Sequence, residues 1–532
     1  MFDILIQNAT IIDGTGSPGY AADLAVQGSK ITAVAKRVDA AAQTIVDAAD
    51  LVVCPGFIDM HSHADFSLPV HRTADSLLHQ GITTAVVGQC GLSPAPLPGD
   101  HRGEVIDTLC GFFGELARAI PWDRWVSFAD YLDYLAEPGC ALNIVPLAGQ
   151  GVIRAGVMGY GNAEPSPDQM ARMRREAIAA MEQGAFGLST GLIYPPGSFT
   201  GTEELIELIE IVGERKGFYF SHIRGEGQTL LEAVKEAIFI GRKTGASVQI
   251  SHFKAARREN WEKSRQALEL IRQAQSEGLD VTADLYPYLA GSTTLGTMLP
   301  EWAHAGGPQE TLKRLADPKL RAKMTNDMQT GGFAKGFDWD QVLITAAPVR
   351  TDYEGRYVSD LAMEAGRPAH EWVFDALVQT RLDISMAIFG MSEENRCREL
   401  AFPGMMIGTD GFGLAVSGPM AKGVPHPRSY GTFPRVLGRY VRELNILSLE
   451  EAVCRMTGRA AQKLRLDDRG RIEPELAADL VIFDPLTIAD RADYENPHQY
   501  AAGISGVIVN GNFVIRDGRH TGALPGRILT RG

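Results

Sequence analysis

The sequence predicts an α/β fold that consists of a (β/α)8 TIM-like barrel and a small β-sandwich domain made from both chain ends. Apolar β runs alternate with helical segments through the middle of the chain, as in parallel βα units. The two ends of the chain instead repeat strand, turn and strand. Several of the apolar runs stop at a histidine or an aspartate. These patterns favour one large barrel with a smaller companion domain.

The companion domain is predicted from the sequence pattern of the two chain ends. Residues 1–56 hold short strands between Gly and Asn turns, as in FDILIQNATIIDG. Residues 466–532 repeat this pattern in ADLVIFDP and GVIVNGNFVIRDGRHTG. We therefore expect both ends to join in one β domain, with the barrel of residues 57–465 inserted between them.

The barrel is predicted from eight apolar runs separated by helical segments such as LLEAVKEAIFIGRK. The candidate strands are FIDMHSH, TTAVVG, LNIVPLA, FGLST, FYFSH, VQISH, VTAD and MMIGTD. In such a barrel the active site lies at the carboxyl ends of the strands. The stretch of about 291–348 is long for one βα connection, so we expect it to form a lid over the barrel mouth.

Composition and net charge indicate what kind of molecule the protein binds. At 532 residues with 45% apolar side chains, the chain can fill a large catalytic domain and a smaller one. The net charge of −14 disfavours nonspecific binding to nucleic acid or to an anionic membrane, so a small-molecule substrate is expected. The N-terminus resembles no signal peptide and no apolar stretch could span a bilayer, so we expect a cytoplasmic protein. The oligomeric state stays open.

Five polar residues at strand ends form a candidate metal site. His61 and His63 make an HxH pair directly after an apolar run, and residues two apart share one face of a strand. His222, His252 and Asp410 each close another predicted strand. A structural histidine pair would explain HxH alone, but convergence at the barrel mouth favours zinc. We expect surface or capping roles for His71, His79, His101, His304, His370, His498 and His520.

The motifs of this chain resemble a known family. FIDMHSHAD, GQCGLSPAP, SHIRGEG, ISHFK, DLYPY, GTDG and HPRSYGTFPR together are similar to the N-acyl-D-amino-acid deacylase (D-aminoacylase) branch of the amidohydrolase superfamily. The resemblance runs through nearly the whole chain and includes the C-terminal YENPHQYAAGISGVIVNG. It implies a metal-dependent barrel that hydrolyses linear amides. The preference for the D configuration is implied by the resemblance alone.

The resemblance also gives the cysteine in GQCG a role. Judged by its neighbours, Cys90 is a small buried hydrophobe. Many amidohydrolases bridge two metals through a carboxylated lysine at the end of the fourth strand, but GLSTGLIYPPG holds no lysine. The D-aminoacylase pattern uses a cysteine instead, and a thiolate is a strong zinc ligand. The resemblance implies one tight zinc on Cys90, His222 and His252, and a second, weaker metal on His61 and His63.

Two further residues match catalytic positions of the family. The resemblance implies that Asp410 takes the proton of the attacking water and returns it to the leaving nitrogen. A helix N-cap before GFG is the alternative role for this aspartate. Tyr194 would polarise the scissile carbonyl, although it could instead pack on Pro195. We expect Asp65 to orient its neighbours or to cap a helix rather than to bind the metal.

An N-acyl amino acid carries a free carboxylate, which requires fixed cations. Lys254, Arg428 and Tyr286 match the carboxylate clamp of the family, and Ser292 is a candidate helper. Solvated cations and a tyrosine packed against a turn are the alternatives.

The first part of the predicted lid contains no Arg or Lys before Lys313. We therefore expect a substrate with a neutral or hydrophobic side chain. Met298, Leu299 and Trp302 are candidate walls for that side chain.

Two other functions remain open at this point. A cyclic-amide hydrolase of the hydantoinase or dihydropyrimidinase type would share the barrel and HxH, but it would require the missing lysine and would not need the Lys254 and Arg428 clamp. A non-catalytic barrel that serves as a scaffold is the second alternative, and such chains typically lose ligands or the base. The candidate ligands and Asp410 are all present.

Overall fold

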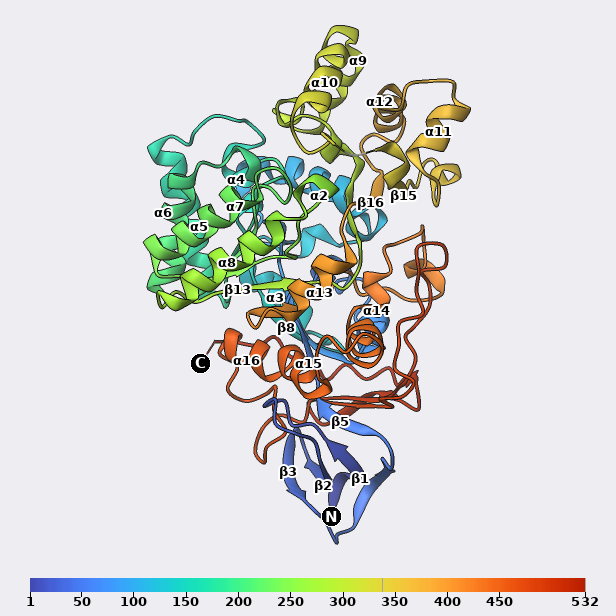
Figure 1. The fold of residues 1–532 in the computed structure, drawn as a ribbon. Coiled ribbons are helices and arrows are strands. Elements are labelled where there is room, and N and C mark those ends of the chain that lie inside the picture. The colour runs from blue at the N-terminus through green and yellow to red at the C-terminus, as the bar shows by residue number, and fades with distance from the viewer. Residues whose placement is uncertain (337, 532) are drawn as a thin grey trace.

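The computed structural model describes residues 1–336 and 338–531, and its centre is a ring of parallel strands (Figure 1). Neighbouring strands pair in parallel along two sheets. The ring strands are β6 (Phe57–Asp59), β7 (Ile82–Val87), β8 (Asn143–Pro146), β10 (Gly187–Gly191), β11 (Phe218–His222), β12 (Ser247–Ile250), β13 (Val281–Leu285) and β17 (Met405–Ile407), with the short β9 (Ala148–Gly149) beside β10.

Backbone hydrogen bonds join the two sheets into a closed ring. The N–H of Phe186 donates to the carbonyl of Pro146 at 2.8 Å, which links β10 to β8. On the other side, the N–H of Met60 donates to the carbonyl of Ile407 at 3.1 Å, which links β6 to β17. Each of the eight apolar runs named above overlaps one ring strand. Their carboxyl ends therefore meet at one mouth.

Helices cover the outside of the ring, and each buries one apolar face against the strands (Figure 1). In α7 (Leu230–Thr244), for example, the buried residues recur at the three- and four-residue spacing of one helix face. The other covering helices are α4 (Gln150–Met158), α5 (Pro167–Glu182), α6 (Thr202–Glu214), α8 (Lys263–Ser276), α13 (Glu393–Ala401), α15 (Leu449–Met456) and α16 (Gly458–Leu464). Between β6 and β8 lie α1 (Asp75–Leu78), α2 (Arg102–Arg118) and α3 (Phe128–Ala136), and α14 (Arg428–Arg435) follows β17.

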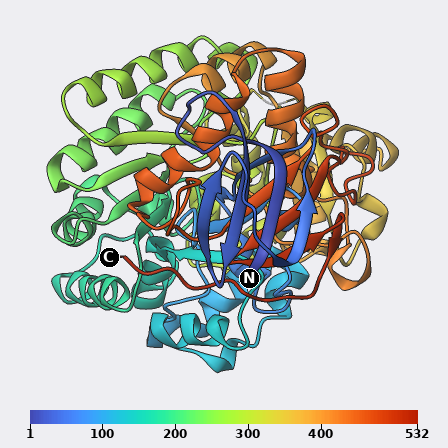
Figure 2. The ribbon, with the colours of Figure 1, turned by 90° about the horizontal axis from the view of Figure 1, so that it is seen from below.

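The two chain ends share one nine-stranded sheet at the foot of the molecule, where Figure 2 shows N-terminal strands (blue) beside C-terminal strands (red). The link is β18, which pairs antiparallel with β5. A separate apolar core holds this sheet together. Its strands are β1 (Phe2–Ile11), β2 (Tyr20–Gln27), β3 (Lys30–Ala35), β4 (Ala42–Asp47), β5 (Val52–Pro55), β18 (Leu480–Phe483), β19 (Ile504–Val509), β20 (Asn512–Arg516) and β21 (Arg519–His520).

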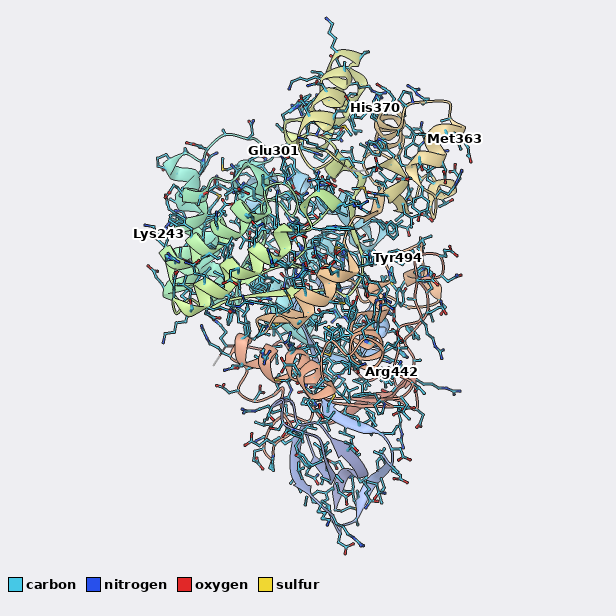
Figure 3. All side chains as sticks on the ribbon, viewed as in Figure 1. Lys243, Glu301, Met363, His370, Arg442 and Tyr494 are labelled. Atoms are coloured by element: carbon cyan, nitrogen blue, oxygen red, sulfur yellow. The ribbon has the colours of Figure 1, made fainter. Side chains whose placement is uncertain are left out.

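An insertion between β13 and β17 stands on the mouth of the ring (Figure 1). It consists of the antiparallel sheet β14 (Ala290–Thr294), β16 (Ser385–Phe389) and β15 (Val342–Ala346), with the helices α9 (Pro308–Ala316), α10 (Pro318–Thr330), α11 (Val358–Glu364) and α12 (Ala369–Gln379). It has its own core, and Met363 and His370 lie on its outer helices (Figure 3).

The insertion is longer than the expected lid of about 291–348. The pairing of Ala290 with Phe389 closes the insertion, and α11 and α12 pack on its sheet rather than on the ring. Met298 and Leu299 are buried in the insertion's own core, and neither lines the cavity at the metal-ligand candidates. The expectation that they wall the cavity at these ligands is therefore wrong, although Leu299 lines a second cavity that adjoins it. Among the described residues, no helix has the length and apolar character needed to cross a membrane.

Candidate active site

Six side chains converge at the mouth of the ring, and none is more than 7% exposed. His61 and His63 follow β6, Cys90 follows β7, and His222 ends β11. His252 and Asp410 follow β12 and β17. They converge because the carboxyl ends of parallel ring strands share one edge.

The backbone is strained at three of these positions. Cys90, His252 and Asp410 have φ angles of 57°, 36° and 50°, in the left-handed region that non-glycine residues rarely adopt. Such a conformation costs about 1–3 kcal/mol per residue and persists only where the surrounding structure imposes it. Left-handed residues also occur elsewhere in the chain, but at these three positions the conformation belongs to residues whose side chains meet at the mouth.

One group of ligand atoms has the geometry of a zinc site. The Sγ of Cys90 lies 3.5 Å from Nδ1 of His222 and 3.5 Å from Nε2 of His252. The two ring nitrogens are 2.9 Å apart. Tetrahedral zinc with its usual bond lengths separates sulfur from nitrogen by about 3.6 Å and two nitrogens by about 3.3 Å. These three atoms therefore fit zinc with one position left open.

A second group shares the same thiol. Nε2 of His61 is 3.4 Å from the Cys90 Sγ and 3.5 Å from Oδ1 of Asp410. Nε2 of His63 is 3.2 Å from the same Asp410 oxygen. The four ligand atoms lie within 4.8 Å of one another. Cys90 thus stands between two candidate metal positions.

Burial keeps the histidine side chains in the neutral form that can bind a metal cation. Burial lowers the pKa of His63 to about 4 and the pKa of His222 well below its usual value, so both imidazoles are neutral near pH 7. Neutral imidazole is the form that binds metal. Burial also raises the pKa of the Cys90 thiol well above its usual value. A divalent cation would overcome this by deprotonating the thiol on coordination.

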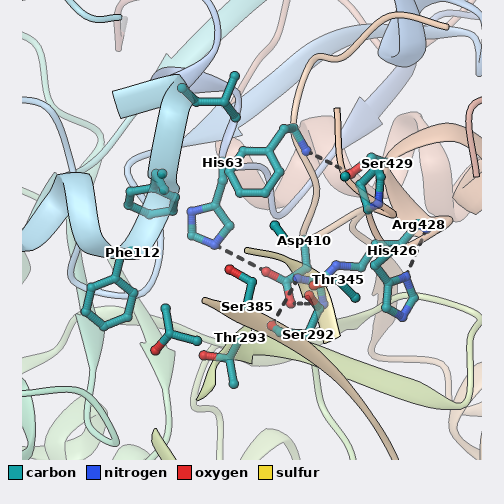
Figure 4. Close-up of a pocket in the computed structure, with 18 of the residues that line it drawn as sticks. His63, Phe112, Ser292, Thr293, Thr345, Ser385, Asp410, His426, Arg428 and Ser429 are labelled. Atoms are coloured by element: carbon teal, nitrogen blue, oxygen red, sulfur yellow. Dashed lines mark hydrogen bonds and ion pairs between the residues drawn. The ribbon is translucent and has the colours of Figure 1, made fainter. Parts of the chain in front are cut away.

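Asp410 is held as a carboxylate by an arginine. Burial alone would raise the pKa of Asp410, but the guanidinium of Arg428 keeps it well below the usual value. Nη1 of Arg428 lies 2.7 Å from Oδ2 of Asp410, while Oδ1 faces His63 (Figure 4). Asp410 can therefore accept a proton at neutral pH.

A cavity of about 900 Å³ opens above these groups, a volume typical of small-molecule sites. Of the eleven residues predicted from sequence, all but His61 line it: His63, Cys90, Tyr194, His222, His252, Lys254, Tyr286, Ser292, Asp410 and Arg428. The Tyr194 hydroxyl lies 3.0 Å from Oγ1 of Thr293, and the Arg428 guanidinium lies 4.8 Å from the centre of the Tyr286 ring. The structure thus brings the predicted metal, catalytic and carboxylate-binding residues to one cavity.

Comparison with known proteins agrees with this geometry. The model of the family described as "Amidohydrolase family" matches residues 44–515. The chain belongs to the amidohydrolase family. The D-aminoacylase of Alcaligenes xylosoxydans xylosoxydans is 38% identical over 531 residues, which cover 100% of this chain and 98% of that protein. The N-acyl-D-glutamate deacylase of the same organism is 34% identical, with 99% of this chain and 96% of that protein covered.

Solved structures of this family superpose over the full chain. The N-acyl-D-glutamate deacylase of Bordetella bronchiseptica, complexed with zinc and a phosphonate inhibitor that mimics the tetrahedral intermediate, has a TM-score of 0.82 at 33% identity, covering 99% of each chain. A D-aminoacylase described as a novel subset of amidohydrolases has a TM-score of 0.82 at 36% identity over 100% of each chain. The L-hydantoinase of Arthrobacter aurescens shares only the fold, with a TM-score of 0.52 and 17% identity. The family predicted from the motifs is confirmed.

The sequence motifs missed Glu226, an acid that lies beside the candidate metal ligands. Oε1 of Glu226 lies 2.9 Å from Nδ1 of His252 and makes a short ion pair with the ammonium of Lys254. Burial would raise its pKa, but Lys254 and the two histidines lower it, so Glu226 is ionised. It is positioned to orient His252 and Lys254 together. The signal was an acid four residues after His222 in SHIRGEG, at a strand end.

Two more residues of the site were missed. Asp284, fully buried at the end of β13, accepts the N–H of His252 at 2.8 Å and lies 3.4 Å from Nδ1 of His61. His426 accepts the N–H of Arg428 at Nδ1 and lies 2.9 Å from the Ala290 carbonyl at Nε2. This pairing requires a neutral His426 with its proton on Nε2. The position of His426 in HPRSYGTFPR, beside Arg428, was the available signal.

The structure shows the partners of three other polar residues that the sequence analysis named. The Asp65 carboxylate is buried and accepts the N–H of Gly88 at 3.1 Å, in the loop that carries Cys90. His79 is buried rather than exposed, and of its two expected roles it has the capping one: it follows the last residue of α1, and its Nδ1 lies 2.8 Å from the Asp75 carbonyl. Its ring stacks on Tyr500 with ring centres 3.8 Å apart. His304 lines a second cavity and lies 3.1 Å from the Gly296 carbonyl at Nε2. Their spacing in sequence carried no sign of these partners.

Proposed function

We propose that the protein is a zinc-dependent hydrolase of N-acyl-D-amino acids, which it cleaves to a carboxylate and a free D-amino acid. The thiol of Cys90 between two sets of imidazoles, beside the buried cations of one cavity, is the observation that carries this proposal. The D-aminoacylase and deacylases reported above support the reaction class. We further propose a preference for neutral or hydrophobic side chains, cytoplasmic location and a small-molecule substrate as the partner.

We propose that Cys90, His222 and His252 hold the tight zinc, and that His61 and His63 hold a weaker second metal. A D-aminoacylase 35% identical to this chain, with a TM-score of 0.83, has a binuclear metal centre. When bound, zinc supplies a water whose pKa falls to about 7 and a Lewis acid for the scissile carbonyl. Glu226 would keep the donor nitrogen of His252 aimed at the site by holding its other nitrogen.

The residues of this chain would then move protons and hold charge. Asp410, kept ionised by Arg428, accepts the proton of the attacking water and returns it to the leaving nitrogen. The low pKa of Asp410 makes its protonated form a ready donor to an amine. The Tyr194 hydroxyl, which burial keeps protonated by raising its pKa, donates toward the developing oxyanion.

We propose that Lys254, Arg428, Tyr286 and Ser292 bind the substrate carboxylate. The guanidinium of Arg428 has five N–H donors, so it can keep its contact with Asp410 while other donors face the ligand. Tyr286 lies between the two cations, 5.7 Å from the Lys254 ammonium and 4.8 Å from the Arg428 guanidinium. The fixed positive charge matches an anionic end group that hydantoins lack.

The ring of parallel strands supports a (β/α)8 barrel at 57–465, with a lid that begins at about residue 291. The pairing of β18 with β5 supports a small β-sandwich domain made from 1–56 and 466–532. In this arrangement the insertion walls the mouth, while the end domain lies at the opposite, structural face of the barrel.

A substrate panel tests the function. Zinc-loaded protein is assayed with N-acetyl-D- and N-acetyl-L-leucine, N-acetyl-D-glutamate, N-acetyl-D-lysine and a hydantoin. We expect turnover of N-acetyl-D-leucine, at least tenfold slower cleavage of the charged D-substrates, and none of the L-substrate or hydantoin. Turnover of the hydantoin alone would establish the cyclic-amide alternative. Protein that lacks zinc and stays inert after zinc is restored would establish the scaffold alternative.

A further inference from the structure

A second cavity of about 480 Å³ adjoins the one at the metal ligands. The two cavities share the wall residues Phe112, Ile193, Tyr194, Glu226, Ala256, Thr294 and Phe333. Asp410, the carboxylate clamp and the candidate metal ligands other than His61 line only the first cavity. Phe112 lies across the first cavity from Arg428 (Figure 4). The second cavity therefore opens at the end of the site away from the clamp.

The shape of the substrate indicates which of its groups lies at this end of the site. An N-acyl amino acid has two arms that diverge from its scissile carbonyl, and the clamp fixes the arm on the nitrogen side. The acyl arm must leave the carbonyl in another direction. Tyr194, proposed to donate to the carbonyl oxygen, lies in the shared wall. Its ring packs edge-to-face with the ring of Phe112, with ring centres 5.2 Å apart. An acyl group on that carbonyl is therefore next to the passage into the second cavity.

The walls of the second cavity suit a hydrocarbon. Apolar and aromatic side chains line it, namely Phe112, Tyr160, Leu192, Ile193, Pro195, Leu299, Phe333 and Leu382. The guanidinium of Arg224 is held by the Glu236 carboxylate at 3.0 Å and by the Thr200 carbonyl at 2.9 Å. Arg257 lies 3.8 Å from Glu259. Both arginines thus have carboxylate neighbours from this chain.

The other charged residues lie at the two ends of the second cavity: Glu226, paired with Lys254, lies in the wall shared with the first cavity, and three others mark the outer rim. Asp107, Glu301 and Arg381 line the cavity and are exposed. Polar side chains such as Ser198, Thr297 and His304 also line the cavity, and the latter two contact backbone carbonyls of the chain itself. A mainly apolar interior with a charged, solvated rim is the arrangement expected for a chain that enters from the metal end and reaches water at its tip. A short acetyl group would leave this volume unused.

We propose that the second cavity is an acyl-chain site, so that the enzyme hydrolyses N-acyl-D-amino acids whose acyl group is a medium-length hydrocarbon. This inference rests on the proposed function and extends it to the acyl side of the substrate. Burial of each methylene contributes about 0.8 kcal/mol, so several methylenes in the cavity would raise kcat/KM by more than tenfold over acetyl.

Gly111 allows the cavity to be filled from one wall. It lies on α2 and lines only the second cavity, and a Cβ at this position meets no atom within 4 Å. Gly111→Leu therefore places a side chain in the cavity without striking the backbone. Gly103→Leu is the matched control, because Gly103 lies on the same helix, is equally open and lines neither cavity.

The test compares kcat/KM for N-octanoyl-D-leucine and N-acetyl-D-leucine in the zinc-loaded protein. We expect an octanoyl-to-acetyl ratio above ten, which Gly111→Leu lowers at least tenfold, Gly111→Ala lowers less, and Gly103→Leu leaves unchanged. N-succinyl-D-leucine should gain nothing over acetyl. Cleavage of acetyl but not octanoyl substrate, a preference for succinyl, or an equal ratio in all variants overturns the acyl-chain site. Loss of turnover on every D-substrate would instead reject the proposed function.

Discussion

At the residue scale, the side chains around Asp410 determine its protonation state and therefore its chemical role. Its two oxygens face different partners, His63 on one side and Arg428 on the other. The arginine outweighs burial and keeps the carboxylate ionised. The positive φ of 50° directs this side chain into the mouth of the ring. Sequence identified Asp410 by its position after a strand, but the pairing with Arg428 required the fold.

We expect Asp410→Asn to lower kcat by about 10² to 10⁴, because the amide cannot accept the proton of the attacking water. Zinc content should be unchanged, since the proposed tight site consists of Cys90 and two histidines. Metal analysis beside steady-state kinetics on N-acetyl-D-leucine checks both statements. Asp352→Asn, at an exposed aspartate outside the cavity, is the control and should behave as wild type. Normal turnover in Asp410→Asn would refute the role of Asp410 as the proton acceptor.

The site was predictable from sequence where its residues stand at strand ends in recognisable motifs. Cys90, His222 and His252 meet this condition, and their atoms lie within ligand distance of one another. Glu226 and Asp284 also lie near strand ends within the quoted motifs, but their roles were missed because a carboxylate acquires its role from the group it touches, and those contacts join different strands. A tertiary contact of this kind leaves no spacing pattern along the chain.

At the element scale, strands were easier to predict than the limits of the insertion. Each ring strand is a short apolar run with a polar end, which local pattern captures. The insertion ends at Phe389 because that residue pairs with Ala290, about a hundred positions away in the chain. Its helices α11 and α12 have the same amphipathic pattern as helices on the ring. Only the sheet they cover distinguishes them.

The short helix α1 contains a pH-dependent contact. Burial would raise the pKa of Asp75, but hydrogen bonds from His71 and Thr73 lower it to about 2. The distances to Oδ2 of Asp75 are 2.8 Å from His71 and 2.6 Å from Thr73. Because the folded pKa lies below the unfolded value, this stabilisation is complete above about pH 5 and is lost as the pH falls toward 2.

We therefore expect Asp75→Asn to lower the free energy of unfolding by about 2 kcal/mol at pH 6, and by progressively less between pH 5 and pH 3. Thermal denaturation of both proteins across this range measures the difference. Asp39→Asn, at an exposed aspartate, should show no such trend. A gap between wild type and Asp75→Asn that stays constant down to pH 3 would contradict the assignment.

At the scale of the whole molecule, the candidate ligands connect strands from distant parts of the chain. Residues from β6 to β17 meet at the mouth, and β6 and β17 are also the strands that close the ring. A bound metal would therefore cross-link the ring near its point of closure. The end domain and the insertion have separate cores, so neither depends directly on this cross-link.

Removal of the metal should consequently destabilise the ring. A ligand that binds only the folded protein adds about 4 kcal/mol at a thousandfold excess over its Kd, so we expect chelation to lower the Tm of the zinc-loaded protein by several degrees. Cys90→Ala removes the ligand shared by both metal positions, so its Tm should start lower and respond little to the chelator. Zinc added back should restore the Tm of wild type only. If chelation shifted both proteins equally, the stabilising metal would lie elsewhere, and the thiol between the two imidazole groups could not be its ligand.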